Sequence, residues 1–280
     1  MTIGQALAGY NDIEADLLLS AVLKKSREFL FMHPEYKLSS YQAKKLSGLV
    51  KRRRLGEPAA YLLGYKDFYG LRFKVSRNVL IPRPESEWLV ERAVKSVKQM
   101  ALGGSITNFS ILDVGTGSGA IIISIAKQLS SRLQVPGYRL IGSDISAAAL
   151  ALARVNAWAC RAKIRFVESD LLQNIKFTPD IIVANLPYVP KKIYDLRFKN
   201  LRFEPKEALV DPEKDFDSYH RLLKQAAALP SRPRLILLEI DPGQKKLLPG
   251  EVKKYLPGAG VKFYRDLAGL WRYAEIKFAA

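Results

Sequence analysis

The first 60 or so residues show the spacing of apolar side chains that is typical of amphipathic helices. Apolar residues recur three and four positions apart in Leu17–Leu23 and again in Leu46–Leu55. Ser39 and Ser40 precede the second run and offer an N-cap. This part of the chain is therefore predicted to form a small helical domain.

The helical pattern ends in a segment rich in glycine and proline. Phe68–Val75 alternates apolar and polar residues as a strand of a hairpin does, and Asn78–Arg83 is expected to continue this strand. A helix is predicted from Glu85 to about Met100, and Gly103–Ser105 is predicted to be a loop.

After this loop, short apolar strands alternate with helices. The expected strands are Ser110–Val114, Arg139–Ser143, Lys163–Glu168, Ile181–Ala184, Leu235–Ile240, Val261–Tyr264 and Trp271–Ile276. The expected helices are Ala120–Leu129, Ala147–Ala159, Ser218–Ala228 and Gln244–Tyr255. Such alternation is typical of a doubly wound, mainly parallel sheet covered on both faces. We therefore expect a helical domain at 1–75, a hairpin or linker with a first helix at 76–104, and an α/β domain at 105–280.

Composition fits a globular protein of 280 residues, with 48% hydrophobic and 26% charged residues. The N-terminal residues lack the pattern of a secretory signal, and the longest apolar stretch, near Ile121–Ile125, is too short to cross a bilayer. The single cysteine, Cys160, excludes an intramolecular disulfide. These features predict a cytoplasmic, monomeric protein with no membrane partner.

The formal net charge of +18 indicates attraction to polyanions or to an acidic protein. Two basic clusters, Lys51–Arg54 and Lys191–Lys206, contribute to it. Each cluster is equally consistent with an ordinary solvated face. Charge alone therefore leaves a nucleic-acid partner and a protein partner open.

The first candidate motif is the glycine-rich turn Asp113–Gly119, which lies between a predicted strand and a predicted helix. It contains Gly115, Thr116, Gly117, Ser118 and Gly119. Glycines allow a sharp turn and a close approach of the backbone to a ligand, and amides at the start of a helix favour acceptor groups. The turn predicts a cofactor site, but it leaves nucleotide and methionine-derived cofactors open.

Two aspartates end the next two predicted strands. Asp144 can accept hydrogen bonds from both ribose hydroxyls of an adenosine-type ligand, or it can cap the helix that begins near Ser146. Asp170 or the amide of Leu171 can meet the amino edge of an adenine, with the Leu171 side chain against the ring. The alternative for Asp170 is a solvated turn. Their order after the glycine turn favours an adenosine-type cofactor.

The tetrapeptide Asn185-Leu186-Pro187-Tyr188 follows the fourth strand and indicates the reaction. A planar –NH2 group has two hydrogens and a delocalised lone pair, so it must be held by two acceptors before it can attack a methyl group. The Asn185 side-chain oxygen and the Leu186 carbonyl can supply them, Pro187 fixes the turn, and Tyr188 can stack on the planar group. An ordinary Asn-x-Pro turn is the alternative. Catalysis would consist of positioning and electrostatics.

Other reaction classes find little support in the sequence. The two histidines, His33 and His220, lie away from the predicted strand ends, which argues against a histidine-based triad or a metal centre. No Gly-Lys-Ser/Thr phosphate loop is present.

With these residues identified, the chain resembles the HemK/PrmC family, the protein-(glutamine-N5) methyltransferases of peptide chain release factors. The more specific segments are Arg54–Gly64, with Gly56-Glu57-Pro58, and Val79–Glu87, with Ile81-Pro82-Arg83-Pro84-Glu85. The segments Asp113–Gly119, Asp144–Ser146, Phe203–Leu209 and Lys262–Arg272 are also similar.

This resemblance implies a Rossmann-like class I methyltransferase sheet, mostly parallel with the last strand antiparallel. It also implies S-adenosyl-L-methionine as cofactor, contacted by Gly115–Gly119, Asp144, Leu171 and Asn185. Asn185–Tyr188 would grip the glutamine of a Gly-Gly-Gln loop, and Arg83 and Pro84 would line the same cleft. The N-terminal helices would help to dock the release factor.

Three positions depart from the family pattern. Leu186 stands where the first proline of Asn-Pro-Pro-Tyr is usual; it keeps the carbonyl but gives a less rigid turn. Leu171 replaces a bulky aromatic residue, which weakens the contact with adenine. Val210–Asp217 replaces a glycine-rich loop.

Two alternatives to a release-factor methyltransferase remain open at this stage. Leucine at position 186 is also found in nucleic-acid adenine methyltransferases, so an N6-adenine methyltransferase acting on RNA or DNA is the main one. A binding module that keeps the fold without turnover is the other.

Overall fold

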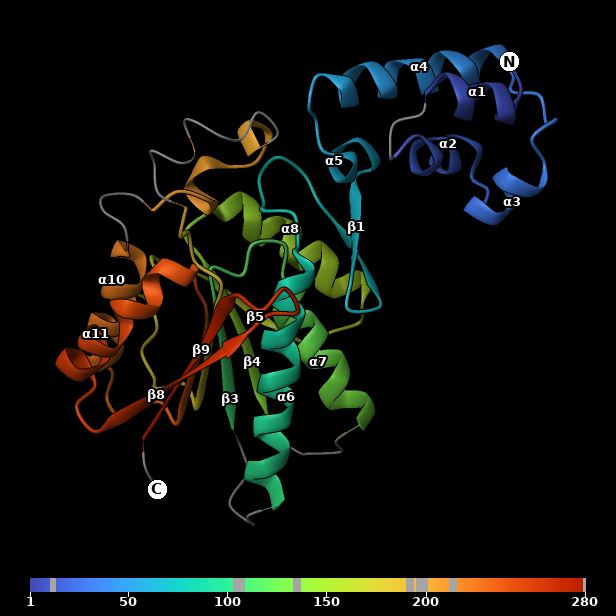
Figure 1. Ribbon diagram of the computed structural model, residues 1–280. Coiled ribbons are helices and arrows are strands. Elements are labelled where there is room, and N and C mark those ends of the chain that lie inside the picture. Colours follow the sequence, from blue (N-terminus) through green and yellow to red (C-terminus); the bar gives the residue numbers. More distant parts are fainter. Residues whose placement is uncertain are drawn as a thin grey trace. The chain divides into compact units, whose positions relative to one another are not determined.

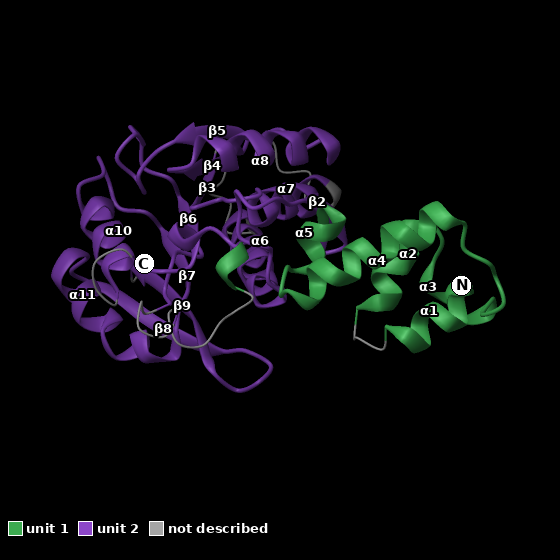
Figure 2. Ribbon diagram, turned by 90° about the horizontal axis from the view of Figure 1, so that it is seen from above, with its two compact units in different colours: residues 1–65, 199–203 green, residues 66–198, 204–280 purple. Residues whose placement is uncertain are grey.

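The computed structural model describes residues 1–10, 14–102, 109–132, 137–189, 194, 201–211 and 216–278. The expected loop at Gly103–Ser105 lies outside them, as does most of the basic cluster Lys191–Lys206. The chain divides into two compact units, Met1–Tyr65 with Lys199–Phe203 and Lys66–Phe198 with Glu204–Ala280 (Figure 2). We call these unit 1 and unit 2.

Unit 1 is helical, as expected for the N-terminal region. Its elements are α1 (Ile3–Gly9), α2 (Ala15–Leu23), α3 (Arg27–Met32), α4 (Ser40–Arg54), α5 (Ala59–Leu63) and the 3-10 helix η2 (Leu201–Phe203). Its core includes Leu18, Leu30 and Leu46, all at most 1% exposed. Ser39 caps α4 as predicted: its hydroxyl accepts the N–H of Gln42, whose side chain accepts the N–H of Ser39 at 2.9 Å.

The basic cluster Lys51–Arg54 forms the last turn of α4, where positive charge complements the helix dipole. Arg52 donates to the carboxylate of Glu57 at 2.8 Å, and Arg53 pairs with Glu14. Arg54 lies over the ring of Tyr10, at 5.6 Å from its centroid, so these three arginines are engaged within unit 1.

The hairpin consists of β1 (Tyr65–Phe68) and β2 (Leu71–Lys74). The expected continuation of the strand through Asn78–Arg83 is wrong, because these residues form turns and irregular backbone. The N–H of Ile81 donates to the side chain of Glu204 at 3.1 Å and so has no strand partner. Phe68 and Phe73 pack in the core of unit 2, which is why this unit begins at Lys66 and includes the expected linker 76–104.

Unit 2 contains a seven-stranded sheet with the order β5-β4-β3-β6-β7-β9-β8 (Figure 1). Its strands are β3 (Ser110–Val114), β4 (Arg139–Asp144), β5 (Arg165–Glu168), β6 (Ile181–Ala184), β7 (Leu235–Glu239), β8 (Ala259–Arg265) and β9 (Trp271–Phe278). β3 to β7 are parallel, and β9 pairs antiparallel with both β7 and β8. The predicted mostly parallel sheet with an antiparallel last strand is confirmed.

Helices cover both faces of this sheet (Figure 1). They are α6 (Glu87–Leu102), α7 (Ala120–Arg132), α8 (Ala147–Ala159), α10 (Asp217–Ala227) and α11 (Leu248–Tyr255), with 3-10 helices η1 (Pro84–Ser86), η3 (Lys206–Ala208) and η4 (Pro242–Lys246). Ile181 of β6 packs in one core with residues of α6 and α7, and Ile182 packs in the other with residues of α10 and α11. Neighbouring residues thus face opposite cores, so β6 is apolar throughout.

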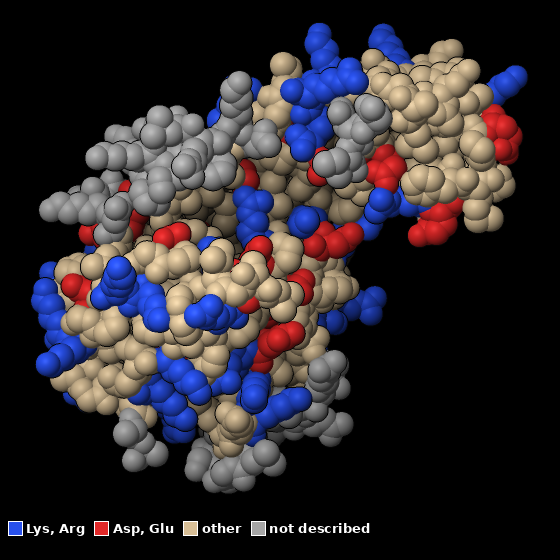
Figure 3. All heavy atoms as spheres, viewed as in Figure 1, with Lys and Arg blue, Asp and Glu red and all other residues tan. Residues whose placement is uncertain are grey.

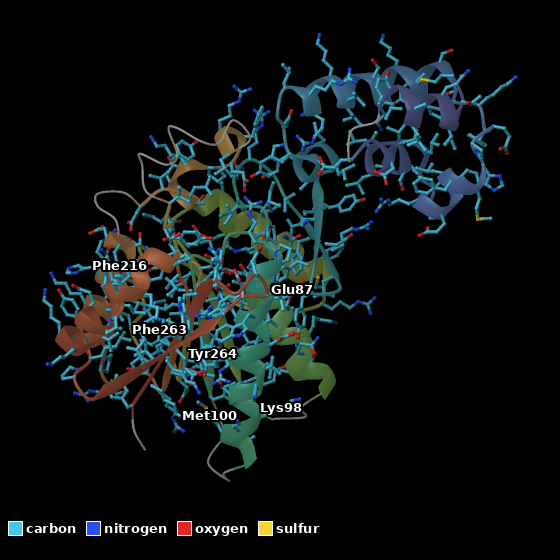
Figure 4. All side chains as sticks on the ribbon, in the orientation of Figure 1. Glu87, Lys98, Met100, Phe216, Phe263 and Tyr264 are labelled. Carbon is cyan, nitrogen blue, oxygen red and sulfur yellow. The ribbon has the colours of Figure 1, made fainter. Side chains whose placement is uncertain are left out.

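α6 is held against the antiparallel end of the sheet by one arginine and one tryptophan. Arg92 donates to Glu275 of β9 at 2.6 Å and to the hydroxyl of Tyr264, labelled on β8 in Figure 4, at 2.8 Å. Trp88 stacks on Tyr273 with a centroid distance of 4.4 Å. The start of α6, next to η1, is therefore fixed relative to β9.

Positive charge in unit 2 is not confined to the clusters seen in the sequence. Figure 3 shows Lys and Arg side chains gathered where Figure 1 draws α11, β8 and β9. Lys245 and Arg265 both lie over the ring of Trp271, at 3.5 and 4.4 Å from its centroid. Among the described helices, none is long and apolar enough to cross a membrane.

Candidate active site

The candidate residues meet at one edge of the unit 2 sheet because of the strand register. Val114 of β3 is paired with Ser143 of β4 on one side and with Ala184 of β6 on the other. Each of these three residues is followed at once by a candidate residue: Gly115, Asp144 and Asn185. Chain order reverses at β3, and ligands of such sheets bind at this switch point, outside the carboxyl ends of the strands.

The glycine turn needs its glycines for two reasons. Gly115 has a φ of +71°, and a Cβ there would lie 3.2 Å from Leu186 Cδ2. Gly119 has a φ of +81°, and a Cβ there would lie 2.8 Å from Ile123 Cδ1. The left-handed backbone and the close approaches both favour glycine. The turn is therefore packed directly against the segment that follows β6.

A buried asparagine fixes the other end of this turn. Asn156 of α8 is 1% exposed, and its side-chain nitrogen donates to the carbonyls of Ser118 at 2.8 Å and Lys74 at 3.0 Å. Its side-chain oxygen accepts the N–H of Lys74 at 2.8 Å. Asn156 thus links the glycine turn to β2, a role that sequence analysis missed.

The side chain of Asp144 bonds to the glycine turn and is not the N-cap of α8. Its carboxylate accepts the N–H of Gly117 at 2.8 Å and that of Ser146 at 2.9 Å, while Ser146 itself caps α8 through Ala149. Burial raises the pKa of Asp144, and the two backbone hydrogen bonds oppose this rise. Since a carboxylate has about four acceptor sites, Asp144 retains capacity for hydroxyl donors.

Asp113 lies beneath the turn and is fully buried. It accepts the hydroxyl of Thr116 at 2.6 Å. Burial raises the pKa of Asp113 to about 7, the Thr116 hydrogen bond lowers it, and the nearby charge of Asp144 raises it further. Two carboxyl groups therefore lie close together under this part of the site.

Asp170 follows β5 and pairs with Arg221 of α10. The same carboxylate oxygen also accepts from Gln173 at 3.3 Å. Leu171 has a φ of +54°, unusual for a leucine, and Gln225 of α10 accepts the next N–H, that of Leu172, at 2.7 Å. Contacts with α10 therefore shape the turn in which Leu171 is found.

The Asn185–Tyr188 segment is tied to several buried groups. Asn185 Nδ2 donates to the hydroxyl of Ser86 at 2.9 Å, and that hydroxyl donates to Glu239 Oε2 at 2.6 Å. The hydroxyl of Tyr188 donates to Glu239 Oε1 at 3.3 Å. Burial, and then the charge of Glu239, raise the pKa of Tyr188 well above its ordinary value. Both ends of the segment thus connect to Glu239.

The carbonyl of Leu186 lies 3.4 Å from the hydroxyl of Tyr219, which also donates to the carbonyl of Glu239. Leu186 as a whole residue is 3% exposed, and its side chain packs in the core shared with α10. The carbonyl oxygen has two lone pairs, so it can accept a second hydrogen bond beside that of Tyr219.

Arg83 and Pro84 precede Ser86 on the same segment, at the start of η1. The guanidinium of Arg83 donates to Glu204 Oε1 at 2.5 Å, and Glu204 is only 3% exposed at its side chain. Glu204 also accepts the N–H of Ile81, so it fixes both the backbone and the side chain of the Ile81–Arg83 stretch.

Sequence analysis missed the role of Ser86, Glu204, Tyr219 and Glu239. Glu204 stands in a segment that carried the family resemblance, and Glu239 ends an apolar strand as Asp144 does. These two positions in the sequence could have indicated that Glu204 and Glu239 belong to the site. The hydrogen bonds themselves join residues up to 153 positions apart.

No histidine takes part in the hydrogen bonds described above for the candidate site. In that part of the chain no group of three or more His, Cys, Asp or Glu residues could hold a metal ion. His33 is the C-cap of α3, and His220 of α10 hydrogen-bonds to Glu251 at 2.7 Å and to Tyr255 at 3.2 Å.

The fold defines the class of protein. Two solved structures share it. The first is the hMettl16 catalytic domain in complex with MAT2A 3'UTR hairpin 6, with a TM-score of 0.55 and 13% identity over 86% of this chain and 83% of that chain. The second is the T. thermophilus 16S rRNA N2 G1207 methyltransferase with AdoMet and guanosine, with a TM-score of 0.54 and 15% identity over 77% of this chain and 50% of that chain. Unit 2 therefore has the class I methyltransferase fold.

Sequence comparison shows the family. The PrmC N-terminal domain matches residues 5–64, and the methyltransferase small domain matches residues 97–200. The release factor glutamine methyltransferase of Coxiella burnetii is 37% identical over 93% of this chain and 89% of its own length. That of Pasteurella multocida is 39% identical over 81% and 78%. The chain belongs to the family of release factor glutamine methyltransferases, which confirms the resemblance drawn from its motifs.

Proposed function

We propose that this chain methylates the side-chain amide nitrogen of the glutamine in the Gly-Gly-Gln motif of a peptide chain release factor, with S-adenosyl-L-methionine as methyl donor. Family membership supports the reaction and the substrate. The observation that carries the proposal is the contact between the glycine turn and the Asn185–Tyr188 segment: a Cβ on Gly115 would lie 3.2 Å from Leu186 Cδ2.

The cofactor is assigned to the edge formed by β3, β4 and β5. The backbone of Gly115–Gly119 would surround its amino-acid part, and the carboxylate of Asp144 would accept from the ribose hydroxyls. Asp170 and Leu171 would meet the adenine, and Asn185 would lie near the sulfur. The residues fit such a group because the space beside Gly117 is open and Asp144 has acceptor sites to spare. When bound, the cofactor supplies a methyl group on a positively charged sulfur.

Asn185 and Leu186 would orient the substrate amide. The Asn185 side-chain oxygen and the Leu186 carbonyl would each accept one N–H of the glutamine –NH2, which aims the nitrogen at the methyl carbon. Once methylated, the nitrogen would release one proton to water. Tyr188 would stack on the planar amide, and Arg83 and Pro84 would bind the flanking substrate backbone.

Unit 1 is assigned to docking of the release factor. Phe31, Met32, Tyr41 and Leu55 are 64%, 72%, 74% and 60% exposed. These side chains are the proposed contacts with the release factor. We expect the protein to act as a monomer in the cytoplasm, where release factors work.

The test is methyl transfer from labelled S-adenosyl-L-methionine to release factors, total RNA and DNA assayed side by side, with the modified residue identified by mass spectrometry. We expect methylation of the Gly-Gly-Gln glutamine, lowered at least about 100-fold by Asn185→Ala. Asn78→Ala is the matched control, because Asn78 is an exposed asparagine of the same unit.

Two other outcomes would replace the proposal. Transfer to adenine in RNA or DNA, with binding that falls steeply with salt, would make the chain an N6-adenine methyltransferase. Calorimetry that detects no binding of S-adenosyl-L-methionine would make it a binding module without turnover.

A further inference from the structure

Glu239 is a buried carboxylate that has no role in the mechanism proposed above. It is 1% exposed and ends β7, where the register pairs Leu238 with Ala184 of β6. Glu239 therefore lies beside Asn185 at the strand edge. A buried carboxylate is costly unless its oxygens are satisfied, so its partners show what holds it there.

Both side-chain oxygens of Glu239 accept from residues next to or within the candidate site. Oε2 accepts the hydroxyl of Ser86 at 2.6 Å, and Oε1 accepts the hydroxyl of Tyr188 at 3.3 Å. The same Ser86 oxygen receives the side-chain nitrogen of Asn185 at 2.9 Å. A chain of hydrogen bonds thus runs from Asn185 through Ser86 to Glu239.

When Glu239 is ionised, its charge gives this chain a direction. An ionised carboxylate can only accept, so the single proton of the Ser86 hydroxyl must point to Glu239. The Ser86 oxygen can then only accept from Asn185. This requires the –NH2 end of the Asn185 amide to face Ser86, and it leaves the oxygen end facing the other way.

The two ends of an asparagine amide have almost the same shape, and only hydrogen bonding selects between them. If the Ser86 proton pointed to Asn185 instead, the amide would be stable in the flipped orientation. It would then present –NH2 to the –NH2 of a glutamine, donor against donor.

We propose that Glu239, acting through Ser86, is a positioning residue that holds the Asn185 amide with its oxygen toward the substrate nitrogen. This inference rests on the proposed function for its substrate, and on the geometry of the described residues for its direction.

The surroundings of Glu239 decide when it carries its charge. Burial raises the pKa of Glu239, while the Ser86 hydrogen bond and the positive charge of Arg272 lower it. The groups that face it are Ser86 and Glu85 of η1, Tyr188 after β6, Tyr219 of α10, and Arg272 and Tyr273 of β9. A protonated Glu239 could donate to Ser86, so turnover should fall as pH drops through the pKa of Glu239.

The experiment compares Glu239→Gln, Ser86→Ala and the double variant with the unmodified protein, using a release factor as substrate. The amide introduced by Glu239→Gln can donate to Ser86 and so removes the fixed direction, whereas Ser86→Ala breaks the chain of hydrogen bonds. We expect each single change to lower kcat by about 10- to 100-fold, with little change in the KM for S-adenosyl-L-methionine. The double variant should be no slower than the slower single variant, because both act through one chain. The acidic fall in kcat that we expect should be absent in Glu239→Gln.

Glu251→Gln is the matched control, because Glu251 is a partly buried carboxylate of unit 2 that bonds to His220. It should retain the kcat and pH profile of the unmodified protein. Full kcat in Glu239→Gln, or losses that multiply in the double variant, would overturn the inference.

A second measurement needs no activity. In the protein without substrate, the NMR signals of the Asn185 side-chain –NH2 should shift with pH as Glu239 titrates, and Ser86→Ala should abolish that shift. If the unmodified protein transferred no methyl to any release factor, the proposed function would fail while this measurement still decided the role of Glu239. Signals that do not respond to pH would refute that role.

Discussion

Gly115 and Leu186 approach each other across the β3–β6 pair, so that a Cβ on Gly115 would come within 3.2 Å of Leu186 Cδ2. The turn proposed to bind the cofactor and the segment proposed to bind the substrate are therefore one packed unit. A substitution in the turn should therefore also affect the segment, and the reverse.

Gly115→Ala should weaken binding of S-adenosyl-L-methionine by about tenfold or more, because Gly115 has a φ of +71° and the new methyl would press on Leu186. Isothermal titration calorimetry would measure this. Gly48→Ala is the control: Gly48 lies within α4 with open space around it, so alanine should leave cofactor binding unchanged. Equal affinity in both variants would argue against a cofactor at this turn.

Asp144→Asn should lower the affinity for S-adenosyl-L-methionine by roughly 10- to 100-fold, because the amide replaces one acceptor oxygen by a donor and removes the charge. Adenine alone, which has no ribose, should bind both proteins equally. If the affinity for S-adenosyl-L-methionine did not change, Asp144 would serve only to hold Gly117 and Ser146.

Asp113 should make unit 2 less stable as pH rises. Its pKa is about 7 in the folded protein against an ordinary value of 3.8, so the folded state binds more protons between these values. The free energy of unfolding should therefore fall from about pH 4 to about pH 7, by at most about 1.4 kcal/mol per pH unit.

Asp113→Asn should flatten this part of the stability profile, because asparagine does not titrate. All three tryptophans, Trp88, Trp158 and Trp271, belong to unit 2, so urea unfolding followed by their fluorescence reports on that unit. Parallel profiles for the two proteins would show that Asp113 does not cause the pH dependence.

Glu204→Ala should destabilise unit 2 by about 2–4 kcal/mol, because it leaves the N–H of Ile81 and the guanidinium of Arg83 without their buried acceptor. Asp67→Ala, at a pair whose side chains are 61% and 63% exposed, should cost less than about 1 kcal/mol. The same fluorescence measurement compares them. A similar loss in both variants would contradict a special role for Glu204.

The strands could be predicted from the sequence because each core strand is a short apolar run, and the candidate residues follow those runs directly. Gly115, Asp144 and Asn185 were located in this way without knowledge of the register. The pairing of Val114 with Ser143 and Ala184 then brings them to one edge.

The partners of these residues could not be predicted, because they depend on tertiary contacts. Nothing local to Ser86 indicates that it binds Asn185 and Glu239, 99 and 153 positions away. The wrong strand at Asn78–Arg83 has the same cause: the alternation is present, but the N–H of Ile81 bonds to Glu204, 123 positions away.

The reversed direction of β9 has a practical consequence for work with this protein. Tyr273, near the start of β9, pairs with Glu239 at the edge that carries the candidate site, so Phe278 at the other end of the strand lies at the opposite edge (Figure 1). An affinity tag or surface linker attached after β9 would extend from the side of the sheet opposite the candidate site. Immobilisation through that end should therefore keep the edge that holds Asn185 open to a large protein substrate.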